Sequence, residues 1–197
     1  MEHTADASGF DAMTLFYVVQ HAEKVQRPGD QPLTALGRLQ AARTAQWLSP
    51  LGLRSVVSSP LRRARETAEA IVAETGLELQ VDARLRERAN WEEGQSFEAF
   101  IDDWAKSVRD RDYVPRPGVS SREAGAQFRA FLLDYASKPG PIAVTTHGGV
   151  TVDLLRTLLG DQAVTSELLD EGVPSCAITT FDGLTVIDIA STKHLEY

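Results

Sequence analysis

Two short apolar runs, each followed by a histidine, constrain the fold of this chain most strongly. Thr14–Val19 (TLFYVV) is rich in β-branched and aromatic residues and leads through Gln20 to His21. Pro141–Thr146 (PIAVTT) has the same character and leads directly to His147. Runs this short and this apolar are typical of strands that are buried on both faces, as in a parallel sheet covered by helices.

Helical periodicity follows the first strand. Thr34 can cap a helix through its hydroxyl, and the pair Ser49 and Pro50 would end that helix. The apolar residues that recur at helical spacing between these points predict the buried face of the helix. They are Leu36, Leu39, Ala42 and Leu48.

The next segment repeats the pattern of a strand followed by a helix. Arg54–Ser58 predicts a second strand. Ser59 followed by Pro60 is typical of an N-cap with proline at the first helical position. We expect this helix to end at Gly76 and a third strand to follow at Leu77–Val81.

The β signal disappears between residues 90 and 141, where two amphipathic helices are expected. Ser96 can cap the first, and Ser120 with Glu123 forms a capping-box pattern before the second. The proline-rich stretch 114–118 separates them. The apolar positions at helical spacing are Phe97, Phe100, Ile101, Trp104 and Val108 in the first helix and Ala124, Phe128, Phe131, Leu132 and Tyr135 in the second.

A helix is also expected after His147, and the chain closes with a predicted hairpin. Its strands are Ala177–Phe181 and Leu184–Ile189, joined around residues 182–183. The alternation of strands and helices predicts an α/β fold, a three-layer α/β/α sandwich around a mostly parallel sheet. Both histidines would then stand at the carboxyl ends of strands, where open α/β sheets bind ligands.

The length of 197 residues predicts one domain, over residues 14–197, preceded by a flexible tail over residues 1–13. The net charge of −8 argues against binding of nucleic acid or of an anionic membrane. No apolar run approaches the length of a membrane span, and the acidic N-terminus does not resemble a signal peptide. We therefore expect a cytoplasmic protein. Its single cysteine, Cys176, predicts a buried residue and no internal disulfide.

Several segments together resemble the histidine phosphatase superfamily, which has the phosphoglycerate-mutase-like fold. The resemblance spans about residues 14–190, and the order and spacing of the segments make it specific. They are VVQHAEK (18–24), PLTALGRLQA (32–41), SSPLRRARETA (58–68), RLRERANWEEG (84–94) and TTHGG (145–149).

The resemblance implies a catalytic role for four residues. His21 corresponds to the nucleophile that becomes phosphohistidine, and Arg63 corresponds to an arginine that binds the phosphoryl oxygens. Glu87 matches the general acid, and His147 matches a second histidine that binds the same oxygens. We also expect the backbone of Gly148 to approach the anion at the start of its helix.

Alternatives remain at two of these positions. Arg62 and Arg65 flank Arg63 and leave a risk in its register, although solvated helix positions explain both. Glu92 and Glu93 compete with Glu87 for the role of general acid. No Cys/His cluster has the spacing of a zinc site, so we expect neither a metal nor another cofactor.

Gln20 is the main departure from the family pattern. The family carries an arginine there, and a glutamine donates hydrogen bonds without bringing a charge. Loss of a charge-assisted bond costs roughly 1.5–3 kcal/mol, which corresponds to about 10–150-fold in rate. Lys24, Arg62 or Arg65 are candidates to restore the positive charge.

Two functions follow from these observations. The first is a phosphatase that hydrolyses a small phosphomonoester through His21. The second, suggested by Gln20, is a phosphatase-fold protein recruited to another reaction or to binding of a phosphorylated ligand. A mutase is less favoured, because the resemblance implies that mutases of this family carry a longer insertion than this compact chain offers. The partner expected is a small phosphorylated or anionic substrate, with a homodimer left open.

The family resemblance also implies a helical lid inserted at about residues 88–140. Its candidate substrate contacts are Trp91, Phe97, Trp104, Tyr113 and Arg116.

Overall fold

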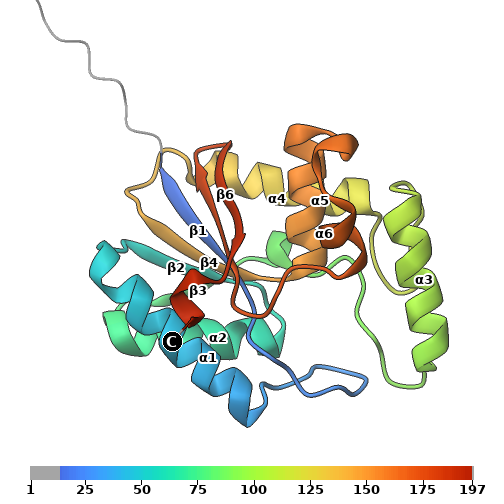
Figure 1. The fold of residues 1–197 in the computed structure, drawn as a ribbon, viewed down its shortest axis with the longest axis horizontal. Helices are drawn as coiled ribbons and strands as arrows, with labels where there is room; N and C mark the ends of the chain where they lie inside the picture. Colours follow the sequence, from blue (N-terminus) through green and yellow to red (C-terminus); the bar gives the residue numbers. More distant parts are fainter. Residues whose placement is uncertain (1–13, 197) are drawn as a thin grey trace, which may run out of the picture.

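The computed structural model describes residues 14–196, so the predicted tail, residues 1–13, lies outside the described residues. Its centre is a six-stranded sheet in the order β3-β2-β4-β1-β5-β6 (Figure 1). The first four strands in this order run parallel, β5 pairs antiparallel with β1, and β6 pairs antiparallel with β5. The strands are β1 (Leu15–Gln20), β2 (Ser55–Ser58), β3 (Leu79–Val81), β4 (Ile142–Thr146), β5 (Ile178–Asp182) and β6 (Thr185–Ser191).

Helices cover both faces of this sheet, as expected for a three-layer sandwich (Figure 1). One apolar core places Val19 of β1 against α1 and α2. The other core places Val18, the preceding residue, against α4 and α5. Successive side chains of a strand point to opposite faces, so both faces of β1 are buried. The helices are α1 (Ala35–Leu48), α2 (Arg62–Thr75), α3 (Phe97–Arg109), α4 (Ser121–Tyr135), α5 (Gly148–Leu159) and α6 (Ser166–Asp170).

The register of β1 and β4 brings the two strand ends together. Gln20 pairs with Thr146 in the parallel ladder. The backbone N–H of His21 then donates to the carbonyl of Thr146 over 2.9 Å. His21 and His147 therefore leave adjacent strands at the same edge of the sheet, which confirms the juxtaposition expected from the sequence.

The buried face expected for α1 is partly wrong. Leu36 and Leu39 are exposed, whereas small residues such as Gly37 and Ala41 are buried. A Cβ atom on Gly37 would lie 2.0 Å from the carbonyl oxygen of Glu23. Close approach of the backbone selects small residues on this side of the helix, so its larger apolar residues face outward.

The N-cap expected at Ser59 is also wrong. Helix α2 begins at Arg62 with Leu61 in the cap position, and its expected end at Gly76 is confirmed. The Ser59 hydroxyl instead lies 2.7 Å from Nε2 of His147. The same hydroxyl accepts a hydrogen bond from the N–H of Leu61 over 3.3 Å, so it keeps a local backbone contact although α2 begins later, at Arg62.

The segment 88–140, expected as a helical lid, consists of two parts with different surroundings. Helix α4 packs against α5, and Phe128, Phe131 and Leu132 of α4 belong to the main core. Helix α3 lies at the side of the molecule, apart from the sheet (Figure 1). The part of this segment that can cover a site at the strand ends is thus α3 with the loop before it.

Candidate active site

A cavity of about 410 Å³ opens beside the carboxyl ends of β1 and β4. This volume suits a small organic ligand. Its polar lining residues are Gln20, His21, Lys24, Gln26, Gln31, Arg63, Glu87, Asn90 and Glu171. Its apolar and glycine lining residues are Ala89, Trp91, Phe97, Phe100, Ile101, Trp104, Gly148, Gly149, Gly172 and Val173.

His21 is held in one tautomer by a backbone contact. Its Nδ1 lies 2.8 Å from the carbonyl oxygen of Ala22. A carbonyl oxygen can only accept a hydrogen bond, so Nδ1 carries the proton and Nε2 carries a free electron pair. Burial, with a further contribution from the charge of Arg63, lowers the pKa of His21 to about 3. The imidazole is therefore neutral at neutral pH, as a nucleophile requires.

Gln20 lies against this nitrogen. Its Nε2 is 3.4 Å from Nε2 of His21, where the amide N–H can donate to the free electron pair. The carbonyl oxygen Oε1 of Gln20 is buried and has no hydrogen-bond partner within residues 14–196. The residue that departs from the family pattern thus faces the cavity and contacts His21 directly.

His147 lies near His21 but does not line the cavity. The two ring centroids lie 5.3 Å apart, and the His147 side chain is completely buried. Ser59 Oγ accepts a hydrogen bond from the N–H of Leu61 over 3.3 Å, so its own proton can go to Nε2 of His147. Nδ1 of His147 has no partner in the described part of the chain. Burial holds the pKa of His147 well below its usual range.

Arg63 is the arginine of α2 that reaches the cavity. Its side chain is 3% exposed, and one guanidinium nitrogen donates to the side-chain oxygens of Gln31 and Asn90 over 2.9 and 3.0 Å. Arg62 and Arg65 are about half exposed and pair with glutamates on the helix surface. The structure therefore places Arg63, rather than its two neighbours, beside His21. No sequence pattern predicted that Gln31 and Asn90 would contact Arg63.

Lys24 is the second cation on the cavity wall. Partial burial, with the nearby charge of Arg63, lowers its pKa to about 8. Of the three residues considered as replacements for the missing arginine charge, Lys24 lines the same cavity as Gln20, and Arg62 and Arg65 do not.

Glu87 connects the loop after β3 to the start of α5. Its two carboxylate oxygens accept hydrogen bonds from the backbone N–H groups of Gly149 and Arg88, over 2.9 and 3.0 Å. Burial raises the pKa of Glu87, which favours the protonated form that a general acid needs. Glu92 and Glu93 do not line the cavity, and Glu92 instead accepts a hydrogen bond from Asn90.

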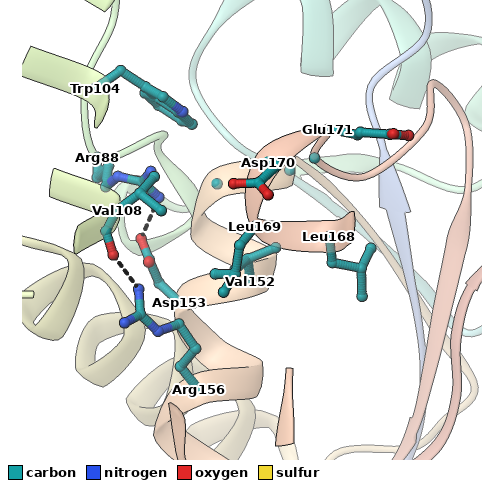
Figure 2. A pocket seen from close by; sticks show the side chains of 13 residues that line it. Arg88, Trp104, Val108, Val152, Asp153, Arg156, Leu168, Leu169, Asp170 and Glu171 are labelled. Atoms are coloured by element: carbon teal, nitrogen blue, oxygen red, sulfur yellow. Dashed lines mark hydrogen bonds and ion pairs between the residues drawn. The ribbon is translucent and has the colours of Figure 1, made fainter. Parts of the chain in front are cut away.

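Arg88 forms a buried contact that links the lid to the sandwich. It donates to Asp153 of α5 over 2.9 Å, and both side chains are about 2% exposed or less. It also donates to Ser107 over 3.0 Å and lies 3.9 Å from the ring centre of Trp104. Figure 2 shows Arg88, Trp104 and Asp153 around a smaller cavity of about 130 Å³. No sequence pattern singled out Arg88, because its partner Asp153 lies far away in the chain.

The expected lid contacts divide in the structure. Trp91, Phe97 and Trp104 line the cavity, whereas Tyr113 and Arg116 do not. The Tyr113 hydroxyl donates to Asp103, in the middle of α3, over 2.6 Å. Tyr113 therefore has a structural contact in place of the substrate contact considered from the sequence.

Comparison with known proteins agrees with this geometry. The model of the histidine phosphatase superfamily (branch 1) matches residues 17–183, so the chain belongs to that superfamily. A probable phosphoglycerate mutase GpmB from Serratia proteamaculans is 31% identical over 191 residues, which cover 86% of this chain and 85% of the relative. No helix within residues 14–196 is long and apolar enough to cross a membrane.

Solved structures of phosphatases share the fold. A mutant of phosphoserine phosphatase from Entamoeba histolytica, in complex with phosphoserine, has a TM-score of 0.72 at 25% identity and covers 93% of this chain and 100% of its own. A mycobacterial glucosyl-3-phosphoglycerate phosphatase, in complex with VO3, has a TM-score of 0.70 at 26% identity, with coverages of 90% and 100%. Both structures thus cover nearly the whole of the sandwich described above.

Proposed function

We propose that this protein is a phosphatase that hydrolyses a small phosphomonoester through a phosphohistidine on His21. In the first step, the electron pair of His21 Nε2 attacks phosphorus. The bond between phosphorus and the ester oxygen breaks, and Glu87 gives its proton to the departing alkoxide. In the second step, Glu87 takes a proton from water. The hydroxide attacks phosphorus, the bond to nitrogen breaks, and neutral His21 is restored.

The orientation of His21 is the observation that carries this proposal. The hydrogen bond from Nδ1 to the Ala22 carbonyl leaves Nε2 unprotonated, and burial keeps the ring neutral. Covalent catalysis by an imidazole needs both conditions at neutral pH. The carbonyl also stabilises the positive charge that the ring develops when it bonds to phosphorus.

Two cations support binding of the phosphoryl group. Arg63 and Lys24 line the cavity with His21, and Nε of Arg63 has no hydrogen-bond partner among the described residues. A buried guanidinium with a free donor is suited to a phosphate oxygen. Lys24 then supplies the charge that Gln20 lacks. His147 does not line the cavity, and its ring lies 5.3 Å from the ring of His21.

Gln20 favours a second candidate function, recruitment to another reaction or to binding alone. Its amide contacts the nitrogen that must attack phosphorus, so this contact has to break before reaction. An amide in place of an arginine also lowers the affinity for a dianion. The pair Lys24 and Arg63 favours the phosphatase over this alternative.

A screen of phosphorylated metabolites for release of inorganic phosphate tests the proposal. The wild type should hydrolyse at least one ester, and His21→Ala should lose essentially all of this activity while keeping the fold. Activity that survives in His21→Ala at a near-native rate would reject the covalent mechanism. We further propose that the enzyme is cytoplasmic and metal-independent, so EDTA should leave the rate unchanged. The same screen should include interconversion of phosphoglycerates, which would indicate a mutase.

A further inference from the structure

The cavity has a polar end and an apolar end. His21 follows β1 directly, Lys24 comes from the loop after it and Arg63 from α2, whereas the aromatic residues come from α3 and the loop before it. On the basis of the proposed phosphatase function, we infer that the alcohol part of the substrate is an uncharged, flat apolar group, such as an aromatic ring, held against α3. We call Trp91, Phe97, Phe100, Ile101 and Trp104 the apolar wall.

The rings of the apolar wall form a continuous series. The ring centroids of Trp91 and Phe97 lie 5.0 Å apart, those of Phe97 and Phe100 lie 6.5 Å apart, and those of Phe100 and Trp104 lie 6.1 Å apart. Phe97, Phe100 and Trp104 occupy one stripe of α3, since positions separated by three, four and seven residues share a helix face. The stripe faces the cavity along much of the helix.

Phe97 and Ile101 of the apolar wall are not covered by packing, whereas Trp104 lies against the Arg88 guanidinium. Of all the residues of α3, which the structure describes completely, Ser107 alone is buried. Phe97 and Ile101 are 49% and 43% exposed although they are large and apolar. Contiguous apolar side chains that line a cavity and stay solvated are typical of a binding surface.

The charges of the cavity argue against a second acidic group on the substrate. Lys24 and Arg63 are its cations within the described residues, and both lie at the phosphoryl end. The guanidinium of Arg88, which lies against Trp104 of the wall, is already paired with Asp153. Glu171 adds a negative charge to the lining. A carboxylate on the alcohol part would meet the apolar wall or Glu171 without a cation to pair with.

Alkyl phosphates with alcohol leaving groups of similar reactivity test this inference. We expect kcat/KM for 2-phenylethyl phosphate to exceed that for ethyl phosphate and for 3-phosphoglycerate by about tenfold or more, since burial of a phenyl ring contributes roughly 1.5–3 kcal/mol. A preference for 3-phosphoglycerate, or equal values for the phenylethyl and ethyl esters, would overturn the inference.

Variants of the apolar wall localise the effect. Phe97→Ala and Ile101→Ala should each reduce the ratio of kcat/KM between phenylethyl and ethyl phosphate severalfold. The matched control is Ile187→Ala, which removes an isoleucine that is 60% exposed on β6, and it should leave the ratio unchanged. A ratio that falls equally in the control, or in none of the three variants, would contradict the assignment of this wall.

A binding measurement separates this inference from the proposed function. Calorimetry with 2-phenylethylphosphonate and ethylphosphonate, which are not hydrolysed, should show at least tenfold tighter binding of the former. If 2-phenylethylphosphonate binds more tightly but no ester is hydrolysed, the phosphatase function is rejected and the inferred class of ligand is retained. Hydrolysis without any difference between the two phosphonates would reject the substrate class and keep the phosphatase.

Discussion

The side-chain amide of Gln20 lies 3.4 Å from Nε2 of His21, the nitrogen that we propose attacks phosphorus. An uncharged donor therefore occupies the place where the superfamily resemblance implies an arginine. Because the contact engages the reactive electron pair, residue 20 affects both the charge of the site and the availability of the nucleophile.

Replacement of this residue by arginine should raise phosphatase activity. In Gln20→Arg, a charge-assisted hydrogen bond to the phosphoryl group replaces a neutral one, and the amide no longer contacts Nε2. We expect kcat/KM for p-nitrophenyl phosphate to rise about tenfold or more. Gln20→Met, which also removes the amide but adds no charge, is the control. A rise on this ester with a fall on the best screened metabolite would support recruitment to another reaction.

Lys24 should give the enzyme a pH dependence near its lowered pKa of about 8. The amine is cationic below that pH and loses its charge above it, so kcat/KM should fall as the pH rises through about 8. p-Nitrophenyl phosphate is the suitable ester, since its leaving group needs no proton from Glu87. Lys24→Arg should shift this decline to higher pH. An unchanged decline in Lys24→Gln would show that another group causes it.

Substitution of the proposed general acid should affect esters according to their leaving groups. Glu87→Gln cannot protonate an alkoxide, so kcat for alkyl phosphates should fall by about 10²–10⁴-fold. The formation of phosphoenzyme from p-nitrophenyl phosphate should be much less affected, because nitrophenolate is a stable anion. Stopped-flow release of nitrophenolate measures that step. Equal losses on both kinds of ester would assign Glu87 a structural role.

The buried pair of Arg88 and Asp153 should stabilise the fold. Arg88→Met leaves the carboxylate of Asp153 buried without its partner, and we expect a loss of about 3–5 kcal/mol in the free energy of unfolding. Arg122→Met removes an exposed ion pair with Asp112 and should cost far less. Urea denaturation of both variants makes the comparison. Similar losses would contradict the importance of burial.

The sandwich and the meeting of His21 with His147 could be predicted from the sequence, because strand length, apolar character and chain order determine which strand ends meet. The role of Ser59 could be predicted only in part: its local pattern suggests a backbone contact, which it makes to the N–H of Leu61, but its second partner, His147, lies far away in the chain. The buried role of Arg88 could not be predicted for the same reason, because Asp153 is remote in sequence. The prediction that Leu36 and Leu39 lie on the buried face of α1 was wrong, because close backbone packing at Gly37 favours small residues on that face.

The most direct test of the account is to identify the residue that carries the phosphoryl group. In Glu87→Gln, activation of water is impaired, so phosphoenzyme formed from p-nitrophenyl phosphate should accumulate. Peptide mapping by mass spectrometry after a quench without acid should locate phosphate on His21, and the additional substitution His21→Ala should abolish the label. Phosphate on His147, or wild-type turnover with no phosphohistidine in any preparation, would contradict the proposed mechanism.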